Sequence, residues 1–132
     1  MSLALKRLAQ KIQQEDLPAF QAEIRTITGY EPEVEVLWDS FTEHTNEYPL
    51  NRLVSPVMRD IKTALTGICK DEFGRSALQA GLERIRIECT DNKDAFTFRF
   101  DNKELYLKAQ LVNSVMHAPT AAVIREVIED RL

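Results

Sequence analysis

The sequence predicts an α+β fold, a two-layer sandwich in which about five helices cover an antiparallel sheet. Residues 84–111 contain three segments that alternate apolar and polar residues, and short turn sequences separate them. Other segments repeat apolar residues every three or four positions, as amphipathic helices do. A length of 132 residues with 44% apolar residues suits one domain, so we expect a single α+β domain over residues 1–132.

Two short helices are predicted at the start of the chain. The first, at about residues 3–15, carries apolar residues at helical spacing. Asp16 is a candidate N-cap for the second helix, and Pro18 suits its first turn. Gly29 is expected to end the second helix, because glycine readily adopts the left-handed conformation that follows many helices.

A strand is predicted near residues 33–38, which read EVEVLW. Val34, Val36 and Trp38 would point to one side of this strand, and they alternate with glutamate and leucine. We expect the strand to extend the sheet formed by residues 84–111. The alternation does not say which edge of that sheet it joins.

Two helices are predicted in the middle of the chain. A Ser-Pro pair is expected to begin a helix at about residues 56–69, because these residue types suit an N-cap and a first turn. Asp71 is the candidate cap of a helix at about 72–81. Phe73 is assigned to the apolar side of that second helix.

Residues 84–111 are predicted to form a three-stranded antiparallel meander. The sequences DNKD and DNKE lie between its strands and are typical of turns. Phe96, Phe98 and Phe100 fall on its apolar face, and each would contribute roughly 1.5–3 kcal/mol if fully buried. Helices must therefore cover this face, and a last helix at about 119–131 is expected to be one of them.

Several kinds of site are excluded by spacing. The glycines lie only at positions 29, 67, 74 and 81, so neither a dinucleotide-binding nor a P-loop motif is possible. The serine-hydrolase motif GxSxG and the zinc motif HExxH are also absent, and the cysteines lack zinc spacing. We therefore expect no cofactor and no metal.

The compartment follows from the N-terminus and the cysteines. The N-terminal residues place lysine and arginine inside an apolar pattern, which is typical of an amphipathic helix rather than a signal peptide. No apolar run approaches the ~20 residues that span a membrane. Cys69 and Cys89 are interpreted as reduced, buried thiols, and we expect a cytoplasmic protein.

The acidic residues are unevenly distributed. The net charge is −4, and residues 1–50 hold four Lys or Arg against nine Asp or Glu. From Glu31 to Glu47 there is no Lys or Arg at all. Such a surface repels nucleic acid and anionic lipid and attracts a basic protein. The residues predicted to bind this partner are Glu33, Glu35, Asp39, Glu43, His44, Glu47 and Tyr48.

Two functions remain open for this acidic region. The first is a non-enzymatic protein-binding or accessory protein that engages a basic partner through residues 33–48, and an inhibitor or immunity-like role is one version of it. The alternative is a small enzyme or ligand-binding protein that uses Asp39, Glu43 and His44 in a pocket beside the sheet. Residues 41–53 are also compatible with a plain polar connector. The sequence leaves partner identity, substrate and oligomeric state open.

The polar face of the predicted meander also has two interpretations. It is rich in basic side chains and could hold an anionic ligand or RNA, or it is a water-facing surface with ion pairs between strands. It lacks the exposed aromatic pair that a base-stacking platform needs, since the phenylalanines occupy the opposite face. We therefore expect no nucleic-acid partner.

Overall fold

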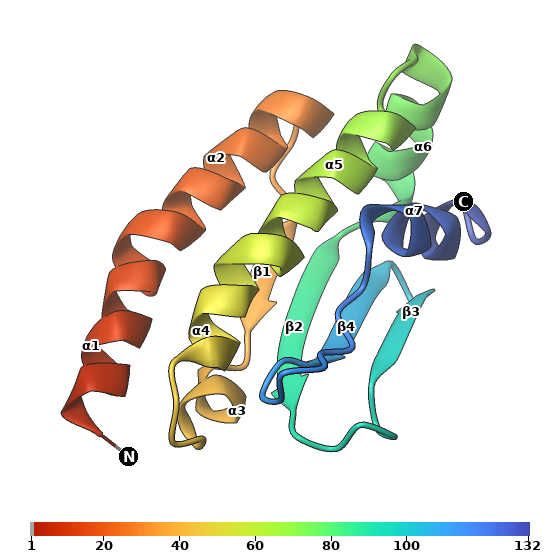
Figure 1. The fold of residues 1–132 in the computed structure, drawn as a ribbon. Coiled ribbons are helices and arrows are strands. Elements are labelled where there is room, and N and C mark those ends of the chain that lie inside the picture. The colour runs from red at the N-terminus through yellow and green to blue at the C-terminus, as the bar shows by residue number, and fades with distance from the viewer. Residues whose placement is uncertain (1) are drawn as a thin grey trace.

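The computed structural model describes residues 2–132, and it confirms a fold that combines helices with one four-stranded sheet (Figure 1). The elements in chain order are α1 (Leu3–Lys11), α2 (Leu17–Thr28), β1 (Glu33–Val36), α3 (Trp38–Thr42), α4 (Tyr48–Arg52), α5 (Arg59–Ile68), α6 (Glu72–Gly81), β2 (Arg84–Thr90), β3 (Thr97–Asp101), β4 (Glu104–Gln110) and α7 (Ala121–Glu129). Helices α2, α5 and α7 lie on one side of the sheet (Figure 1).

The sheet is mixed, so the prediction of an antiparallel meander is wrong. Its strand order is β1-β2-β4-β3, with β1, β2 and β4 mutually parallel and only β3 antiparallel to β4. The loop from β2 to β3 passes over the end of the sheet and leaves a gap of one strand, and β4 then occupies that gap between β2 and β3. Alternation specifies the face of each side chain but not the neighbouring strand. The more apolar β4 takes an interior position beside β2, whereas β3 lies at the edge.

The predicted apolar face is confirmed for β2 and β4. Ile85, Ile87, Leu105 and Leu107 are fully buried, and their polar neighbours in sequence face the other side. The three phenylalanines differ from the prediction that all three are core residues. Phe100 is buried and Phe98 partly buried, whereas Phe96 lies before the first residue of β3 and is exposed.

The first two predicted helices form one continuous helical segment. A π-helical turn, Ile12–Asp16, joins α1 to α2, and Asp16 has helical backbone angles with no side-chain capping bond. The wide turn adds one residue, which keeps Ile12, Phe20 and Ile24 on the buried side. Asp16 is therefore not an N-cap. Gly29 does end α2, with φ of 83°, as predicted.

Residues 41–53, for which the sequence left a site or a polar connector open, are largely helical. Helices α3 and α4 occupy most of it, and only residues 43–47 between them are not helical. Phe41, Leu50 and Leu53 are fully buried and anchor this otherwise polar segment to the hydrophobic core. Ser55 has an extended backbone and marks a kink before α5.

Helix α6 confirms one prediction and corrects another. The Asp71 carboxylate accepts a hydrogen bond from the Gly74 backbone N–H at 2.8 Å, so Asp71 is the N-cap. Phe73 is 88% exposed rather than part of the core. Only Leu78 of α6 is fully buried, because the helix packs at the end of the molecule and contacts it along a narrow strip.

Candidate functional site

Residues 39–48 of the predicted site lie at the carboxyl ends of the parallel strands. Because β1, β2 and β4 run in the same direction, the segments that follow them meet at one end of the sheet. These segments are residues 38–48, 91–96 and 112–117, and Figure 1 shows them together at the lower end of the molecule. We refer to these three segments as the carboxyl-end surface.

Helix α3 is fixed to the end of β2 by Ser40. The Ser40 hydroxyl donates to the Leu37 carbonyl at 2.5 Å and accepts from the Cys89 backbone N–H at 3.0 Å. Phe41 is fully buried beneath the helix. With one side of the helix anchored in this way, Asp39 and Glu43 lie on its exposed side.

Helix α4 is tied to the segment after β4 by Arg52. Its guanidinium donates to the carbonyls of Leu111, at 2.8 Å, and Asn113. The same guanidinium lies 4.8 Å from the ring centroid of Tyr48, a cation–π distance. Tyr48 is thereby held at the surface with 55% of its side chain exposed.

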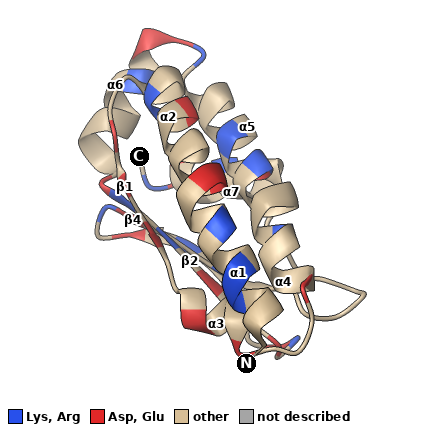
Figure 2. Cartoon of the chain, turned by 90° about the vertical axis from the view of Figure 1, so that its left-hand side faces the viewer, with Lys and Arg blue, Asp and Glu red and all other residues tan. Residues whose placement is uncertain are grey.

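The carboxylates of this surface have no Lys or Arg partner among the described residues. Within residues 2–132, no Lys or Arg nitrogen lies within 4.0 Å of Asp39, Glu43 or Glu47. Figure 2 shows the acidic residues on α3 and the basic residues on the neighbouring α1. The negative charge of the three carboxylates is therefore not cancelled by ion pairing.

Glu33 and Glu35, at the other end of the predicted site, lie on β1. Glu33 pairs with Arg84 of β2 at 3.3 Å, and Arg84 also pairs with Glu104 of β4 at 3.3 Å. Glu35 lies beside Arg86 in the strand register but forms no ion pair with any residue that the structure describes. The strand part of the acidic region is thus partly neutralised by the sheet itself.

His44 is the one predicted site residue that the fold buries. Its side chain is 10% exposed, and its Nε2 has no hydrogen-bond partner among the described residues. Nε2 lies 3.7 Å from Oε1 of Glu43, whose side chain is 64% exposed. The structure brings Glu43 and His44 together, whereas no side-chain bond joins Asp39 to either of them within residues 2–132.

The Cys89 thiol lies behind this surface. Its pKa is raised to about 11, mainly by burial and also by the carboxylates of Glu43, Asp91 and Glu88, against the lowering effect of a hydrogen bond with the Leu111 backbone. A thiol in this environment stays protonated at neutral pH and is a poor nucleophile. Cys89 and Cys69 are both free and buried, as predicted.

Exposed apolar side chains on the same surface were not predicted. Val115 is 73% exposed and Met116 39% exposed, and both lie in the segment that follows β4. Phe96 stacks on His117, with ring centroids 4.8 Å apart and planes within 6°. In the sequence these residues are a Val-Met pair within a turn-rich stretch. Because apolar residues have no regular spacing in that stretch, the sequence did not indicate whether this pair is buried or exposed.

The segment that carries these apolar residues is ordered by Gln110, which is fully buried. Its Oε1 accepts from the backbone N–H groups of Val112 and Asn113 at 2.8 and 2.9 Å. Its Nε2 donates to the Val115 carbonyl at 2.8 Å. Gln110 therefore satisfies three backbone groups of an otherwise irregular segment and fixes its shape.

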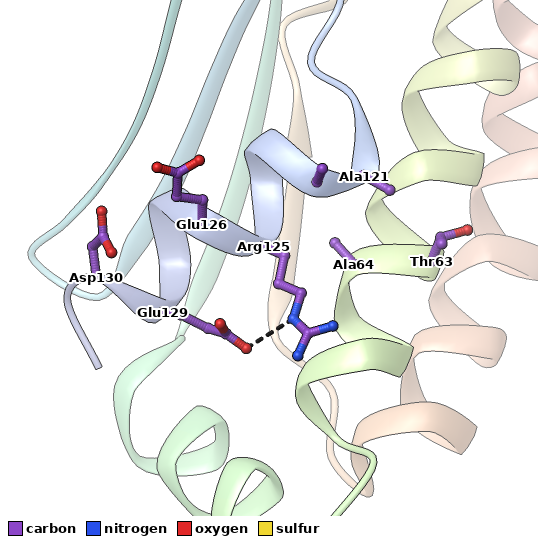
Figure 3. Close-up of a pocket in the computed structure, with 8 residues that line it drawn as sticks. Thr63, Ala64, Ala121, Arg125, Glu126, Glu129 and Asp130 are labelled. Carbon is purple, nitrogen blue, oxygen red and sulfur yellow. Dashed lines mark hydrogen bonds and ion pairs between the residues drawn. The ribbon is translucent and has the colours of Figure 1, made fainter.

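A hollow of about 370 Å³ lies elsewhere, between α5 and α7 (Figure 3). It is lined by Thr63 and Ala64 on one side and by residues of α7 on the other. Arg125 crosses it and pairs with Glu129 at 2.9 Å, so its charge is already compensated. Neither this hollow nor an adjoining one of about 390 Å³ is lined by Asp39, Glu43 or His44.

The open face of the sheet carries the ion pairs expected for a water-facing surface. Besides the Arg84 pairs, Arg99 lies 3.7 Å from Asp101. The guanidinium groups of Arg86 and Arg99 lie 5.7 and 4.5 Å from the Tyr106 ring centroid. Positive charges on this face are therefore interleaved with carboxylates and stacked on an aromatic ring.

Three further findings bear on function. Within residues 2–132, no three His, Cys, Asp or Glu side chains are grouped so as to hold a metal ion. No helix in the described part of the chain is long and apolar enough to cross a membrane. No protein-family model, curated protein or solved structure matches the chain.

Proposed function

We propose that the protein is a non-enzymatic binding or accessory protein that engages a basic protein partner through residues 33–48. An inhibitor or immunity-like role is one form of this proposal. The observation that carries it is the set of exposed carboxylates at the carboxyl-end surface, Asp39, Glu43 and Glu47, which have no Lys or Arg partner among the described residues. A protein partner with a basic surface would supply the missing cations.

Charge on this surface would act mainly on association. Uncompensated carboxylates attract a basic partner over a range set by the ionic strength and so raise the association rate. Exposed carboxylates cost little to maintain in the free protein, because water solvates them. The arrangement therefore favours encounter with a basic partner without a large loss of stability.

Affinity needs desolvated contacts in addition to charge. The exposed apolar residues beside the carboxylates, Tyr48, Val115 and Met116, are of the types that form the centre of protein interfaces. Arg52 stacks against the Tyr48 ring, and Gln110 fixes the backbone at Val115. A partner that binds here would therefore lose little entropy in ordering the Tyr48 ring and this backbone segment.

The alternative proposal is a small enzyme or ligand-binding protein that uses Asp39, Glu43 and His44. One observation favours it, the buried His44 Nε2 beside Glu43. Against it, Glu43 is well exposed, whereas a catalytic carboxylate is commonly placed in a desolvated pocket. We therefore prefer the contact proposal.

A charge-reversal experiment separates the two. The Glu43→Lys/Glu47→Lys variant and the wild-type protein are immobilised and used to capture partners from the native host, at low and high salt. The matched control is Glu126→Lys/Asp130→Lys, which makes the same change in charge at the far end of the molecule. We expect loss of a basic partner in the first variant only, and a smaller difference at high salt.

His44→Ala tests the alternative directly. The contact proposal expects this variant to capture the partner much as the wild type does, because a single neutral imidazole adds little to the field. If a turnover is found that His44→Ala abolishes while the charge reversal leaves it intact, the contact proposal is wrong.

A further inference from the structure

The outer edge of β1 is unpaired. β1 is the first strand in the sheet order and bonds only to β2, through Glu33 N–H to Glu83 and Leu37 N–H to Ile87, both at 2.9 Å. Successive residues of a strand direct their backbone groups to opposite sides, so those of Val34 and Val36 point away from β2. Across the described residues, no segment bonds to these outward groups.

A hollow of about 350 Å³ adjoins this edge. It is lined by Gln21, Ile24, Glu31, Pro32, Glu33 and Val34, which places it between α2 and β1. Figure 2 views the molecule from the side on which β1 lies. The space beside β1 and under α2 is where a fifth strand of the sheet would lie, about 4.8 Å from β1.

The side chains around this edge define what such a strand needs. On the open face, Glu33 pairs with Arg84, which also pairs with Glu104, whereas Glu35 lies beside Arg86 in the strand register without an ion pair among the described residues. Two carboxylates therefore share one cation in the row of Glu33, and both glutamates of β1 are exposed at the edge. On the opposite face, Val34 is a partly exposed apolar side chain beside the hollow, whereas Ile24 is fully buried. A complementary strand would alternate a cation toward the open face with an apolar residue toward α2.

A second copy of this chain is a poor match for the edge. Pairing β1 with β1 would bring Glu33 and Glu35 of one copy beside the same residues of the other. Like charges at adjacent positions across strands are destabilising, and natural edge strands use charge to prevent such self-association. The charge pattern therefore favours a basic strand over self-pairing.

From these observations we infer that the basic partner docks by strand addition. An extended segment in which Lys or Arg alternates with an apolar residue pairs with the outer edge of β1 as a fifth strand. The inference rests on the proposed function and adds to it the mode of docking and the sequence pattern of the partner. Backbone hydrogen bonds to Val34 and Val36 supply affinity, and the glutamates select the cationic residues.

The first test uses a capped synthetic peptide in which Lys and Val alternate. Amide hydrogen exchange of Val34 and Val36 is followed by NMR while this peptide is added to the wild-type protein. We expect exchange at these two amides to slow by about tenfold when the free peptide is at ten times its Kd. Two control peptides are used, one with Glu in place of Lys and one with the same composition in scrambled order, and neither should protect the amides.

The second test removes the outward N–H of β1. Val34→Pro lacks that donor but keeps the bonds from Glu33 and Leu37 to β2, and proline is tolerated at sheet edges. Val34→Ala is the control, since it keeps the N–H while removing more of the side chain than the proline substitution does. We expect at least a tenfold loss of affinity for the Lys-Val peptide in the proline variant only, with a thermal melt to verify folding.

Three results would overturn strand addition. The first is Lys-Val peptide binding that perturbs residues 39–48 but leaves Val34 and Val36 unprotected; this would leave the proposed contact surface standing. The second is equal protection by the scrambled peptide. The third is a dimer by sedimentation that Val34→Pro abolishes, which would assign the edge to a second copy. Failure of the proposed function is recognised separately, by a host partner that the Glu43/Glu47 reversal does not affect.

Discussion

The helix-covered face of the sheet and the carboxyl-end surface differ in how far their side chains are buried and in whether their charges are paired. On the first, Ile87 and Leu107 are fully buried among apolar neighbours. On the second, Glu43 lacks a Lys or Arg partner within the described residues and Val115 is largely exposed. Changes on the helix-covered face should therefore alter folding, whereas changes on the carboxyl-end surface should alter association.

The largest effect is expected from a charge on the helix-covered face. Leu107→Asp would place an unpaired carboxylate at the centre of β4, at a cost of several kcal/mol that is comparable to the whole stability of a domain. We expect this variant to fail to fold, as judged by circular dichroism. Lys108→Asp, on the open face of the same strand, should fold. If both variants folded, or if neither did, the assignment of Leu107 to the helix-covered face and Lys108 to the open face would be contradicted.

An intermediate effect is expected at Gln110, which connects the two regions. Gln110→Ala would leave three backbone groups of residues 112–115 without partners, and we expect a loss of about 1–3 kcal/mol in the free energy of unfolding. The control is Gln79→Ala, because exposed Gln79 also bonds a backbone carbonyl but water can replace it. Urea denaturation measures both, and a larger loss for Gln79→Ala would be unexpected.

The pH dependence of stability provides a third comparison. The folded-state pKa of Cys89 is raised to about 11 from an unfolded value of 9.0. Its contribution to stability is therefore complete below about pH 9 and is lost as pH rises toward 11. We expect Cys89→Ala to show a shallower loss of stability between these pH values than the wild type, in denaturation curves measured at each pH. If the two proteins lost stability equally over this pH range, the Cys89 thiol would lie in a more polar environment than the structure shows.

The smallest effect is expected from single surface carboxylates. Glu33→Gln removes an exposed pair with Arg84 and should cost at most about 1 kcal/mol, less at high salt. Glu43→Gln removes no pair with Lys or Arg and should change stability by less than about 0.5 kcal/mol. Thermal melts at two salt concentrations compare them. If Glu43→Gln lowered the melting temperature more than Glu33→Gln, and high salt reduced that difference, the expected ranking would be contradicted.

The site was only partly predictable from sequence. The acidic stretch was visible because Glu43 and Glu47 lie in a run without Lys or Arg. Glu33 forms an ion pair because the fold brings Arg84, 51 residues away in the chain, beside it. No Lys or Arg of the described residues pairs with Glu43. The apolar part was missed, because exposure of Val115 and Met116 depends on how Gln110 shapes the segment.

The sequence by itself determined the type and approximate bounds of most elements and the face that each strand buries. Alternation in β2 and β4, the glycine after α2 and the Asp71 cap depend on neighbouring residues, so they can be read locally. Two errors, at Asp16 and Phe73, arose where local spacing suited more than one packing arrangement.

Only the tertiary structure decided the strand order, and with it the location of the surface. Local patterns favour a hairpin between β2 and β3, but insertion of β4 between them buries the most apolar strand at the centre. This choice makes three strands parallel, so their carboxyl ends meet and bring residues 38–48, 91–96 and 112–117 together. It also leaves β1 at an open edge. Which strands become neighbours depends on the total apolar area buried by the whole chain, a quantity that no single segment contains.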